Sequence, residues 1–447
     1  MTYSNLKNAD PLIYNLLKEE ESRQKKGIEL IPSENYTSRA VLEALGSVLT
    51  DKYSEGYCGN RYYEGNSVID KIENLAKKRA IELFNVPHAN VQPYSGSPAN
   101  LAVYLATCSP GDTVLGLGLT NGGHLTHGSK ASITGRYFKS IPYLVKTDGS
   151  IDYEAVEELA TEHKPVLIWC GATAYVKKID YSRFAQIAES CGAYLAADIA
   201  HISGLIIAGV HPSPVEYAHI VTTTTHKTLR GPRGGIIMVT RRGLEKDPDL
   251  AKKIDKSVFP GLQGGPHNNT TSAIAVALKE ASEESFKEYA KNIVENASVL
   301  AEELMRRGFN LIGNGTENHL ILIDMRPMNI NGWYFAKALE AASIVTNKNT
   351  VPGETNSPFY PSGIRIGTPA ITSRGMNAKD MVQVAQFMSD VKDALNKYKY
   401  ISVKMSGKNK IEREQFKSDI AKDKDIIRIR KEVEEFASKF IIPSLDK

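Results

Sequence analysis

The chain has 447 residues, which is too long for one hydrophobic core and favours two domains. Its hydrophobic fraction of 42% is typical of a folded globular protein and argues against disorder. The net charge is only +4, so charge gives no support for nucleic-acid or membrane-surface binding. No apolar run reaches the ~18 residues of a membrane span. The first ten residues also lack the basic and apolar segments of a secretory signal.

The cysteines also bear on the compartment. They are scattered and form no C-x-x-C pair, at positions Cys58, Cys108, Cys170 and Cys191. Such thiols are typical of a reducing environment. We therefore expect a cytoplasmic protein without disulfides.

The first ninety residues alternate between helical patterns and loops. Residues 10–26 keep helical apolar spacing among charges, which predicts a helix that packs on another surface, such as a second subunit. Residues 29–37 contain a proline and read as a loop, and residues 39–48 as a short helix. Residues 67–84 predict a strongly amphipathic helix.

Residues 52–66, KYSEGYCGNRYYEGN, fit neither period and are interpreted as a loop. The segment contains four tyrosines around Glu55 and Arg61. It is either a surface loop with aromatic anchors or the wall of a functional site, and the second interpretation fits the composition better.

A polar turn, Ser95-Gly96-Ser97, opens an apolar helix. Free N–H groups at a helix start favour an anion, and two hydroxyls add donors. An ordinary helix cap is the alternative explanation.

Strand patterns then recur, most of them separated by helical patterns, at residues 112–119, 165–171, 193–198, 219–225 and 234–239. This alternation predicts a mostly parallel sheet that binds ligands at the carboxyl ends of its strands. Asp198 and Lys227 fall at such ends. Asp198 also fits a helix N-cap, and His201 also fits simple packing.

Residues 221–235, VTTTTHKTLRGPRGG, place Lys227 between threonine hydroxyls and glycines. A lysine in this position is a candidate amine for a Schiff base. The loop 122–129 adds two histidines, His124 and His127.

The second half begins with a Gly/Pro-rich loop at residues 258–269 and a long helical stretch at 269–307. We place a domain boundary near residue 282, inside that stretch. Within the turn-rich residues 347–372, Arg365 has apolar neighbours on both sides, which favours an inward carboxylate clamp over a surface charge. Residues 401–447 predict a solvated helical face.

Four of these features together match one cofactor. An aldehyde needs an amine, a phosphate needs a helix N-terminus, and a pyridine nitrogen needs a carboxylate. Lys227, the turn at residues 95–97 and Asp198 fill these roles, and His124 or His127 supplies a flat group for the ring face. The combination predicts a site for pyridoxal phosphate.

The same stretches resemble the serine hydroxymethyltransferase family. From about residue 10 to residue 398, and in the family's order, the resemblance rests on IPSENYTS, KYSEGYCGNRYYEGN, QPYSGSPANL, GGHLTHGS, AADIAHISGL, VTTTTHKTLRGPRGG, VFPGLQGGPHNN, GNGTENHL and SPFYPSGIRIGTPA. It implies the aspartate aminotransferase-like fold of pyridoxal-phosphate enzymes. That fold has an N-terminal dimerisation arm (residues 1–30), a large domain with a seven-stranded, mostly parallel sheet (31–282) and a smaller α/β domain (283–447).

The resemblance also implies roles at the cofactor. Lys227 would form the Schiff base, Asp198 would pair with the pyridinium nitrogen, and His124 would stack on the ring. His201 would orient the side of the phenolic oxygen and the carboxylate. Further cofactor contacts would come from Ser95, Gly96, Ser97 and His226, and across a homodimer with shared active sites, or a tetramer of such dimers, from Tyr53, Gly264 and Gly265.

The implied reaction, a step of one-carbon metabolism, converts L-serine and tetrahydrofolate reversibly to glycine and 5,10-methylenetetrahydrofolate through an external aldimine. Arg365 would clamp the substrate carboxylate with help from Ser33. Glu55, with Tyr63 beside it, would be the acid–base group, and Thr224 would tune proton transfer at the α-carbon. The positions that match the folate site are Leu119, Gly123, Leu125, Asn349, Ser357, Pro358 and Phe359. No metal is implied.

Two other functions remain open at this stage. A threonine-type aldolase, or a hydroxymethyltransferase for a substituted serine, would keep Lys227, Asp198 and Arg365 but need no folate. A non-catalytic binding protein of the same fold would be expected to have lost the lysine or its acid partner, and both are present. Glu64 stands where the family usually has glycine, so it bears on folate affinity and substrate range.

Overall fold

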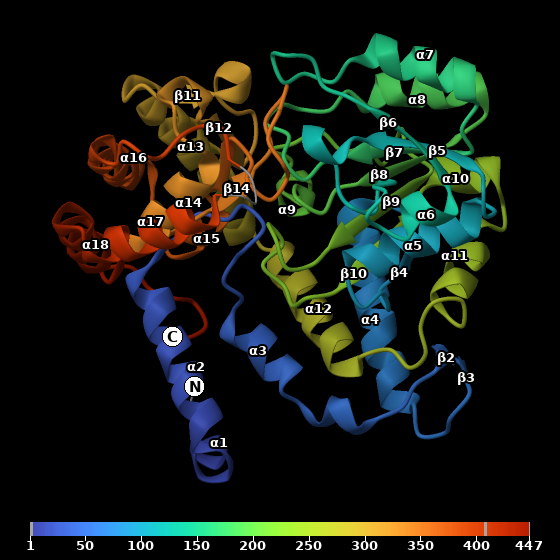
Figure 1. The fold of residues 1–447 in the computed structure, drawn as a ribbon. Helices are drawn as coiled ribbons and strands as arrows, with labels where there is room; N and C mark the ends of the chain where they lie inside the picture. Colours follow the sequence, from blue (N-terminus) through green and yellow to red (C-terminus); the bar gives the residue numbers. More distant parts are fainter. Residues whose placement is uncertain (1–2, 406–408, 447) are drawn as a thin grey trace. The chain divides into compact units, whose positions relative to one another are not determined.

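The computed structural model describes residues 3–405 and 409–446. The chain divides into two compact units (Figure 1). The central unit contains residues 40–291, and the terminal unit combines residues 1–39 with 292–447. Each unit is described separately below.

The central unit is built on a seven-stranded sheet in the order β4-β10-β9-β8-β7-β5-β6. Its strands are β4 (His88–Asn90), β5 (Thr113–Leu117), β6 (Lys139–Tyr143), β7 (Leu167–Gly171), β8 (Tyr194–Asp198), β9 (Ile220–Thr224) and β10 (Gly235–Val239). Among the described strands of this sheet, β10 runs in the direction opposite to the other six. Strands β7, β9 and β10 are buried at every position, as expected for a sheet covered on both faces. The predicted α/β fold with a mostly parallel seven-stranded sheet is confirmed.

Helices cover both faces of this sheet: α7 and α8 lie on one side, and α5 and α11 on the other (Figure 1). The helices of the unit are α3 (Arg39–Leu45, at the unit boundary), α4 (Ser67–Phe84), α5 (Gly96–Thr107), α6 (Thr134–Tyr137), α7 (Tyr153–His163), α8 (Tyr181–Cys191), α9 (Ser203–Ile207), α10 (Arg241–Lys246), α11 (Leu250–Val258) and α12 (Asn268–Ala281). Short 3-10 turns are η1 (Val48–Asp51) and η2 (Leu119–Asn121). A core of Val103, Trp169 and Ile254 joins α5, the sheet and α11.

Two local expectations needed correction. Residues 52–66 are not a plain loop, because β2 (Gly56–Tyr57) and β3 (Asn60–Arg61) pair as a small antiparallel hairpin. The long helical stretch is two helices, α12 and α13 (Glu284–Arg306), separated at residues 282–283. Neither strand of the hairpin exceeds two residues, so periodicity had no window in which to detect it.

The terminal unit contains a four-stranded antiparallel sheet in the order β11-β12-β15-β14. These strands are β11 (Asn310–Leu311), β12 (Leu320–Asp324), β14 (Asn347–Asn349) and β15 (Gly363–Gly367). A separate parallel pair joins β1 (Ile28–Glu29) to β13 (Ile344–Val345). Its helices are α1 (Ser4–Ala9), α2 (Pro11–Lys26), α14 (Gly332–Ala341), α15 (Pro369–Ser373), α16 (Ala378–Ala394), α17 (Lys410–Lys422) and α18 (Lys424–Ala437), and α13 crosses the unit boundary. Its 3-10 turns are η3 (Ile312–Asn314), η4 (Arg326–Met328) and η5 (Leu395–Lys397).

Helix α2 follows the prediction for residues 10–26 closely. The Asp10 side chain caps it by accepting N–H groups from Leu12 and Ile13, both at 3.1 Å. None of its residues is buried, and Leu12 and Leu16 are 76% and 58% exposed. The apolar face therefore stays open within this chain.

The four cysteines are free thiols, as expected. Within the described residues, no helix combines the length and the hydropathy needed to span a membrane.

Candidate active site

Asp198 lies at the carboxyl end of β8, where its side chain is held by three donors. Its Oδ2 atom accepts from His127 Nε2 at 3.1 Å and from Asn100 Nδ2 at 2.8 Å, and its Oδ1 atom accepts the Ala200 amide at 3.0 Å. Burial opposes ionisation, but the bond and charge of His127, with His124 and Lys227, lower the pKa of Asp198. The Asp198 side chain is only 11% exposed, so the site holds a largely buried, ionised carboxylate.

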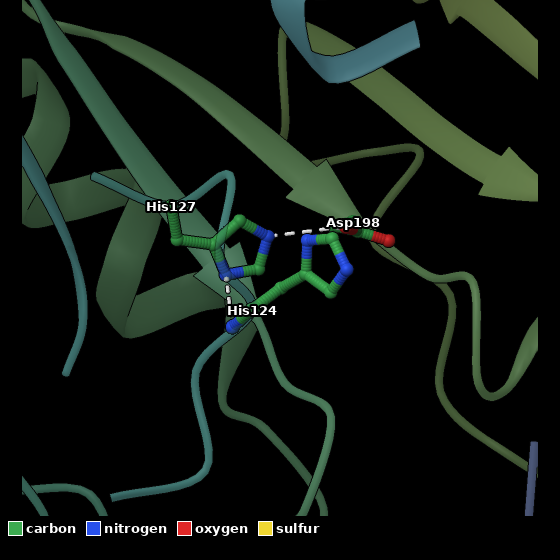
Figure 2. Close-up of side chains that lie close together, drawn as sticks. All are labelled: His124, His127 and Asp198. Carbon is green, nitrogen blue, oxygen red and sulfur yellow. Dashed lines mark hydrogen bonds and ion pairs between the residues drawn. The ribbon is translucent and has the colours of Figure 1, made fainter. Parts of the chain in front are cut away.

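The two histidines of the loop after β5 have different surroundings (Figure 2). His127 bonds Asp198, and its ring stacks on Trp169 with centroids 5.3 Å apart. His124 donates its amide to His127 Nδ1 at 3.3 Å, and its ring Nδ1 lies 2.7 Å from Thr126 Oγ1. Burial, then the charges of His127 and Lys227, lower the pKa of His124 to about 4, so its imidazole is neutral near pH 7.

Lys227 follows β9 by three residues and is 8% exposed. Two polar atoms beside it in sequence, Thr224 Oγ1 and His226 Nδ1, are buried without a hydrogen-bond partner among the described residues. Burial and the charges of Lys227 and Arg233 lower the pKa of His226 to about 3. A buried polar atom without a hydrogen-bond partner costs free energy. Such atoms are therefore typical of a site where a ligand supplies the missing partner.

The Ser95–Ser97 turn opens α5 as predicted, with Ser95 at the N-cap. The Ser95 side chain makes no capping bond, so an ordinary cap does not explain this residue. A Cβ on Gly96 would lie 2.7 Å from Thr224 Cγ2, so only glycine lets the start of α5 approach the end of β9. The first N–H groups of the helix thus lie beside the strand that leads to Lys227.

His201 lies in the loop after β8 and is 5% exposed. Its carbonyl accepts Thr228 Oγ1 at 3.2 Å, and the same hydroxyl accepts the Gly204 amide at 3.0 Å. These bonds tie the loop after Asp198 to the residue that follows Lys227.

A second cluster combines the hairpin with the Gly-rich loop. The rings of Tyr53 and Tyr63 lie 5.6 Å apart, and both are largely exposed. A Cβ on Gly264 would lie 3.3 Å from Glu55 Oε1, and one on Gly265 would lie 3.3 Å from Tyr53 Cδ1. The structure therefore brings these five predicted residues together within one chain.

The predicted folate positions of the central unit lie in and after the turn that follows β5. Leu119 and Leu125 are 40% and 46% exposed, whereas Gly123 is buried. A Cβ on Gly123 would lie 1.8 Å from the carbonyl oxygen of Leu117, so this close turn requires glycine.

The terminal unit holds the remaining predicted site residues. Arg365 in β15 is 7% exposed, donates Nε to Asn347 Oδ1 at 3.0 Å, and has its pKa lowered to about 10 by burial. Its predicted inward orientation is therefore observed. The end of β15 contacts the loop that bears Ser33, since a Cβ on Gly367 would lie 2.5 Å from Pro32 Cβ.

The folate positions of the terminal unit lie in β14 and in the turn before β15. Asn349 pairs with Gly363, and the Phe359 amide lies 3.4 Å from Ser357 Oγ. Phe359 is 75% exposed, and Pro358 beside it is also exposed.

Three residues that support Asp198 escaped the sequence analysis. Asn100 receives Thr222 Oγ1 on its carbonyl at 2.7 Å, which aims its amide group at Asp198. Trp169 carries the His127 ring. An asparagine within an apolar helix and a threonine within a strand were weak signals, and only the fold shows that they meet.

His124, His127 and Asp198 also have the composition of a metal site, because one ligand atom from each lies within 4.8 Å of the others. However, the His127 and Asp198 atoms already bond each other, and the His124 ring nitrogen contacts Thr126. These bonds favour a structured carboxylate pocket over a metal centre.

Comparison with known proteins then decides the family. Residues 6–388 match the family model described as serine hydroxymethyltransferase. The chain belongs to the serine hydroxymethyltransferase family. Three proteins named serine hydroxymethyltransferase are similar to it. The relative from Sorangium cellulosum is 57% identical over 88% of this chain and 91% of its own length. The one from Acidothermus cellulolyticus is 57% identical over 87% and 90%, and the one from Desulfotalea psychrophila is 56% identical over 86% and 89%.

Membership of the serine hydroxymethyltransferase family confirms the resemblance found in the sequence, and with it the fold type of the pyridoxal-phosphate enzymes. Because the match ends at residue 388, the last helices, α17 and α18, lie beyond it.

Proposed function

We propose that this chain is a serine hydroxymethyltransferase that interconverts L-serine and tetrahydrofolate with glycine and 5,10-methylenetetrahydrofolate. The observation that carries the proposal is the largely buried, ionised Asp198 at the sheet edge that also bears Lys227 and the Ser95 turn, in a chain of this family. We also propose that the protein works in the cytoplasm as a homodimer.

The residues at this edge fit pyridoxal phosphate. Asp198 supplies the charge that a protonated ring nitrogen requires, and the start of α5 supplies N–H donors for the phosphate. Within the described residues, the unpartnered Thr224 Oγ1 and Ser203 Oγ atoms offer further hydroxyls. When bound, pyridoxal phosphate supplies the electron sink that lets a bond to the substrate α-carbon break.

The chain's own residues then orient the reaction. Lys227 would provide the amine that holds the cofactor. Neutral His124 would be the residue that covers the ring face, since His127 is already bonded to Asp198 and stacked on Trp169. The Thr224 hydroxyl lies three residues before Lys227 and is assigned to proton transfer near the α-carbon.

The substrate carboxylate is assigned to Arg365 and Ser33. Burial disfavours the Arg365 guanidinium, and a bound carboxylate offsets this cost by bidentate pairing. Lysine has no matching fork, so Arg365→Lys should weaken serine binding.

Glu55 is assigned to moving the proton between the serine hydroxyl and the folate amine. Because Tyr53, Tyr63, Gly264 and Gly265 lie with Glu55, a contribution of Tyr53 to the partner's cofactor would bring Glu55 with it. We therefore propose that the whole cluster acts in the partner's active site.

A spectral titration tests the chemistry. Glycine is added to the purified holoenzyme, followed by tetrahydrofolate, and the visible spectrum is recorded. We expect a strong long-wavelength band only when both ligands are present. Threonine cleavage without any effect of folate on the spectrum would instead favour the aldolase.

Hybrid dimers test the sharing of sites. Lys227→Ala and Tyr53→Ala are each expected to be inactive, and their mixture should regain activity because one of the two sites in a hybrid is intact. Exchange of subunits is followed with differently tagged chains. If exchange is complete and activity stays absent, the sites are not shared in this way.

A further inference from the structure

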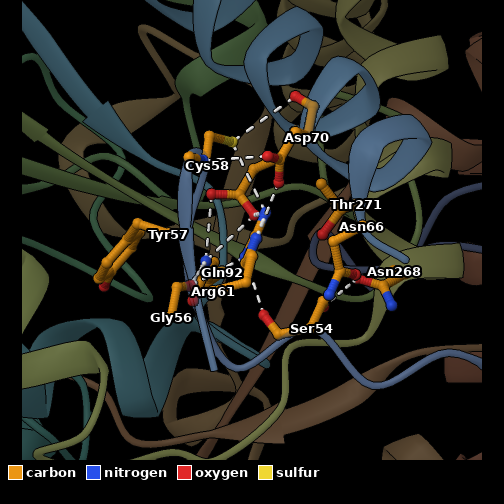
Figure 3. Close-up of polar contacts among 12 residues, drawn as sticks. Ser54, Gly56, Tyr57, Cys58, Arg61, Asn66, Asp70, Gln92, Asn268 and Thr271 are labelled. Atoms are coloured by element: carbon orange, nitrogen blue, oxygen red, sulfur yellow. Dashed lines mark hydrogen bonds and ion pairs between the residues drawn. The ribbon is translucent and has the colours of Figure 1, made fainter. Parts of the chain in front are cut away.

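The two residues that flank Glu55 in the chain, Ser54 and Gly56, are both bonded to Arg61 (Figure 3). Arg61 Nη1 donates to the carbonyl oxygens of Ser54 and Gly56, both at 2.8 Å. The Glu55 carbonyl accepts the Tyr62 amide at 3.0 Å. Three successive peptide carbonyls are thus engaged, and two of them depend on one guanidinium.

Arg61 is in turn held by helix α4. Its Nη2 atom bonds Glu73 Oε2 at 2.8 Å, and its Nε atom bonds Asp70 Oδ1 at 2.9 Å. The Arg61 and Glu73 side chains are only 4% and 3% exposed. A buried charge is stable only when it is paired, so this pair fixes where Arg61 can lie.

Gln92, which follows β4, connects the Arg61–Glu73 pair to the Ser95–Ser97 turn. Its Nε2 atom donates to Gly56 O at 3.0 Å and to the Glu73 carboxylate at 3.1 Å. Its main-chain carbonyl accepts Gln263 Nε2 at 2.9 Å, and Gln263 Oε1 accepts the Tyr94 amide at 3.0 Å. Gln263 directly precedes Gly264, and Tyr94 directly precedes Ser95.

We propose that Arg61, Glu73 and Gln92 are positioning residues that set the place of the Glu55 carboxylate beside the Gly264–Gly265 turn, within the cluster assigned to the partner's active site. The proposal rests on the acid–base role of Glu55. Arg61 and Gln92 bond the backbone that flanks Glu55, and the Glu73 carboxylate bonds both of their side chains, so all three act through the position of Glu55.

The variants follow from this geometry. Glu73→Gln keeps the size of the side chain. It replaces one carboxylate oxygen, which accepts hydrogen bonds from Arg61 and Gln92, with an NH2 group that can only donate. Gln92→Met leaves the Arg61–Glu73 pair intact and removes only the bonds to Gly56 and Glu73, so it tests the proposal if the first variant folds poorly. Glu82→Gln on the same helix is the matched control, because its pair with Lys78 is exposed.

Steady-state kinetics of the holoenzyme with serine and tetrahydrofolate provide the first readout. We expect Glu73→Gln to lower kcat by about 10–100-fold, the scale of a misplaced catalytic group, with little change in the KM for serine. Gln92→Met should show a smaller loss in the same direction, and Glu82→Gln none. A rise in KM alone, with kcat unchanged, would overturn the proposal.

A double-mutant cycle separates positioning from a general structural effect. If Glu73 acts through Glu55, Glu55→Gln with Glu73→Gln should be no slower than Glu55→Gln alone. If the kcat loss of the double variant equals the product of the two single-variant losses, Glu73 acts independently of Glu55. Near-normal turnover of Glu55→Gln by itself would instead reject the assigned role of Glu55.

Hydrogen exchange gives a readout that needs no turnover. The Tyr62 amide, bonded to Glu55 O, should lose protection in the cofactor-free Glu73→Gln protein and keep it in Glu82→Gln. Unchanged protection in Glu73→Gln would overturn the claim that the pair fixes the hairpin.

Discussion

Glu73 is a fully buried carboxylate and Asp198 a largely buried one, and their partners are of different kinds. Glu73 faces a permanently charged guanidinium at 2.8 Å, and its charge is therefore neutralised inside the protein. Asp198 is bonded by an amide, an imidazole and a main-chain N–H, which orient the carboxylate without placing a guanidinium on it. Its remaining charge is available to a cationic ligand. Glu73, whose charge is balanced by Arg61, thus supports the fold. Asp198, which is oriented by hydrogen bonds but has no guanidinium partner, marks the site.

The largest expected effect in this comparison is the loss of turnover in Asp198→Asn. The amide keeps the shape but cannot stabilise a protonated ring nitrogen, so kcat should fall by about 1,000-fold, the scale for losing one preorganised electrostatic group. Cofactor affinity, measured by absorbance titration, should also fall. In urea denaturation of the cofactor-free proteins, Asp198→Asn should lose less stability than Glu73→Gln. Equal losses would contradict the view that Glu73 supports the fold and Asp198 the site.

The second effect is the loss of stability in Glu73→Gln. Removing the Glu73 charge breaks the buried ion pair. Asp70, whose side chain is 24% exposed, is then the remaining carboxylate partner of Arg61. We expect the free energy of unfolding to fall by about 3 kcal/mol, the lower end for a broken buried pair. Urea denaturation of the cofactor-free protein checks this value. A loss as small as that of Glu82→Gln would show that the pair is not structural.

The sequence predicted one of these carboxylates much better than the other. Asp198 and Lys227 end apolar strands of a βα pattern, and the carboxyl ends of parallel strands share one edge, so their proximity follows from topology. Glu73 occurs in an amphipathic helix, where a glutamate normally faces water. Its burial depends on Arg61, which lies in a hairpin of two-residue strands that periodicity cannot detect.

The supports of Asp198 were beyond sequence reasoning for a similar reason. Asn100 is 98 residues away from Asp198 in sequence, and its orientation depends on a bond from Thr222 on a third element. No local pattern encodes such a meeting. By contrast, the helix α4 was predicted at its observed bounds, because its signal is contained in consecutive turns.

A third prediction concerns pH. Because the folded-state pKa of His124 is about 4, against 6.5 for a free imidazole, the unfolded chain binds more protons between these values. Stability is therefore fully present above pH 6.5 and falls as the pH drops toward 4, by about 3 kcal/mol for this group. His226 contributes in the same sense.

Urea unfolding of the cofactor-free protein, repeated at several pH values, measures this effect. His124→Phe should flatten the profile between pH 6.5 and 4. The lowered pKa of Asp198 acts at still lower pH, since a carboxylate's contribution is lost only as the pH falls through its folded-state pKa. An unaltered profile in His124→Phe would show that this imidazole does not stay neutral.

The smallest effect is expected at Glu64, a carboxylate that is neither paired like Glu73 nor buried like Asp198. It is exposed and directly follows Tyr63 in the chain. Water already solvates its charge, so Glu64→Gly should change the free energy of unfolding by no more than about 0.5 kcal/mol. Its charge can act only through solvent on a folate nearby, which limits any change in the KM for tetrahydrofolate to about fivefold. Adding salt should reduce that change, because exposed charges are screened. A larger change in the KM for tetrahydrofolate that does not depend on salt would mean that Glu64 contacts the folate directly. In that case an exposed carboxylate, and not only one as shielded as Asp198, would contribute to the site.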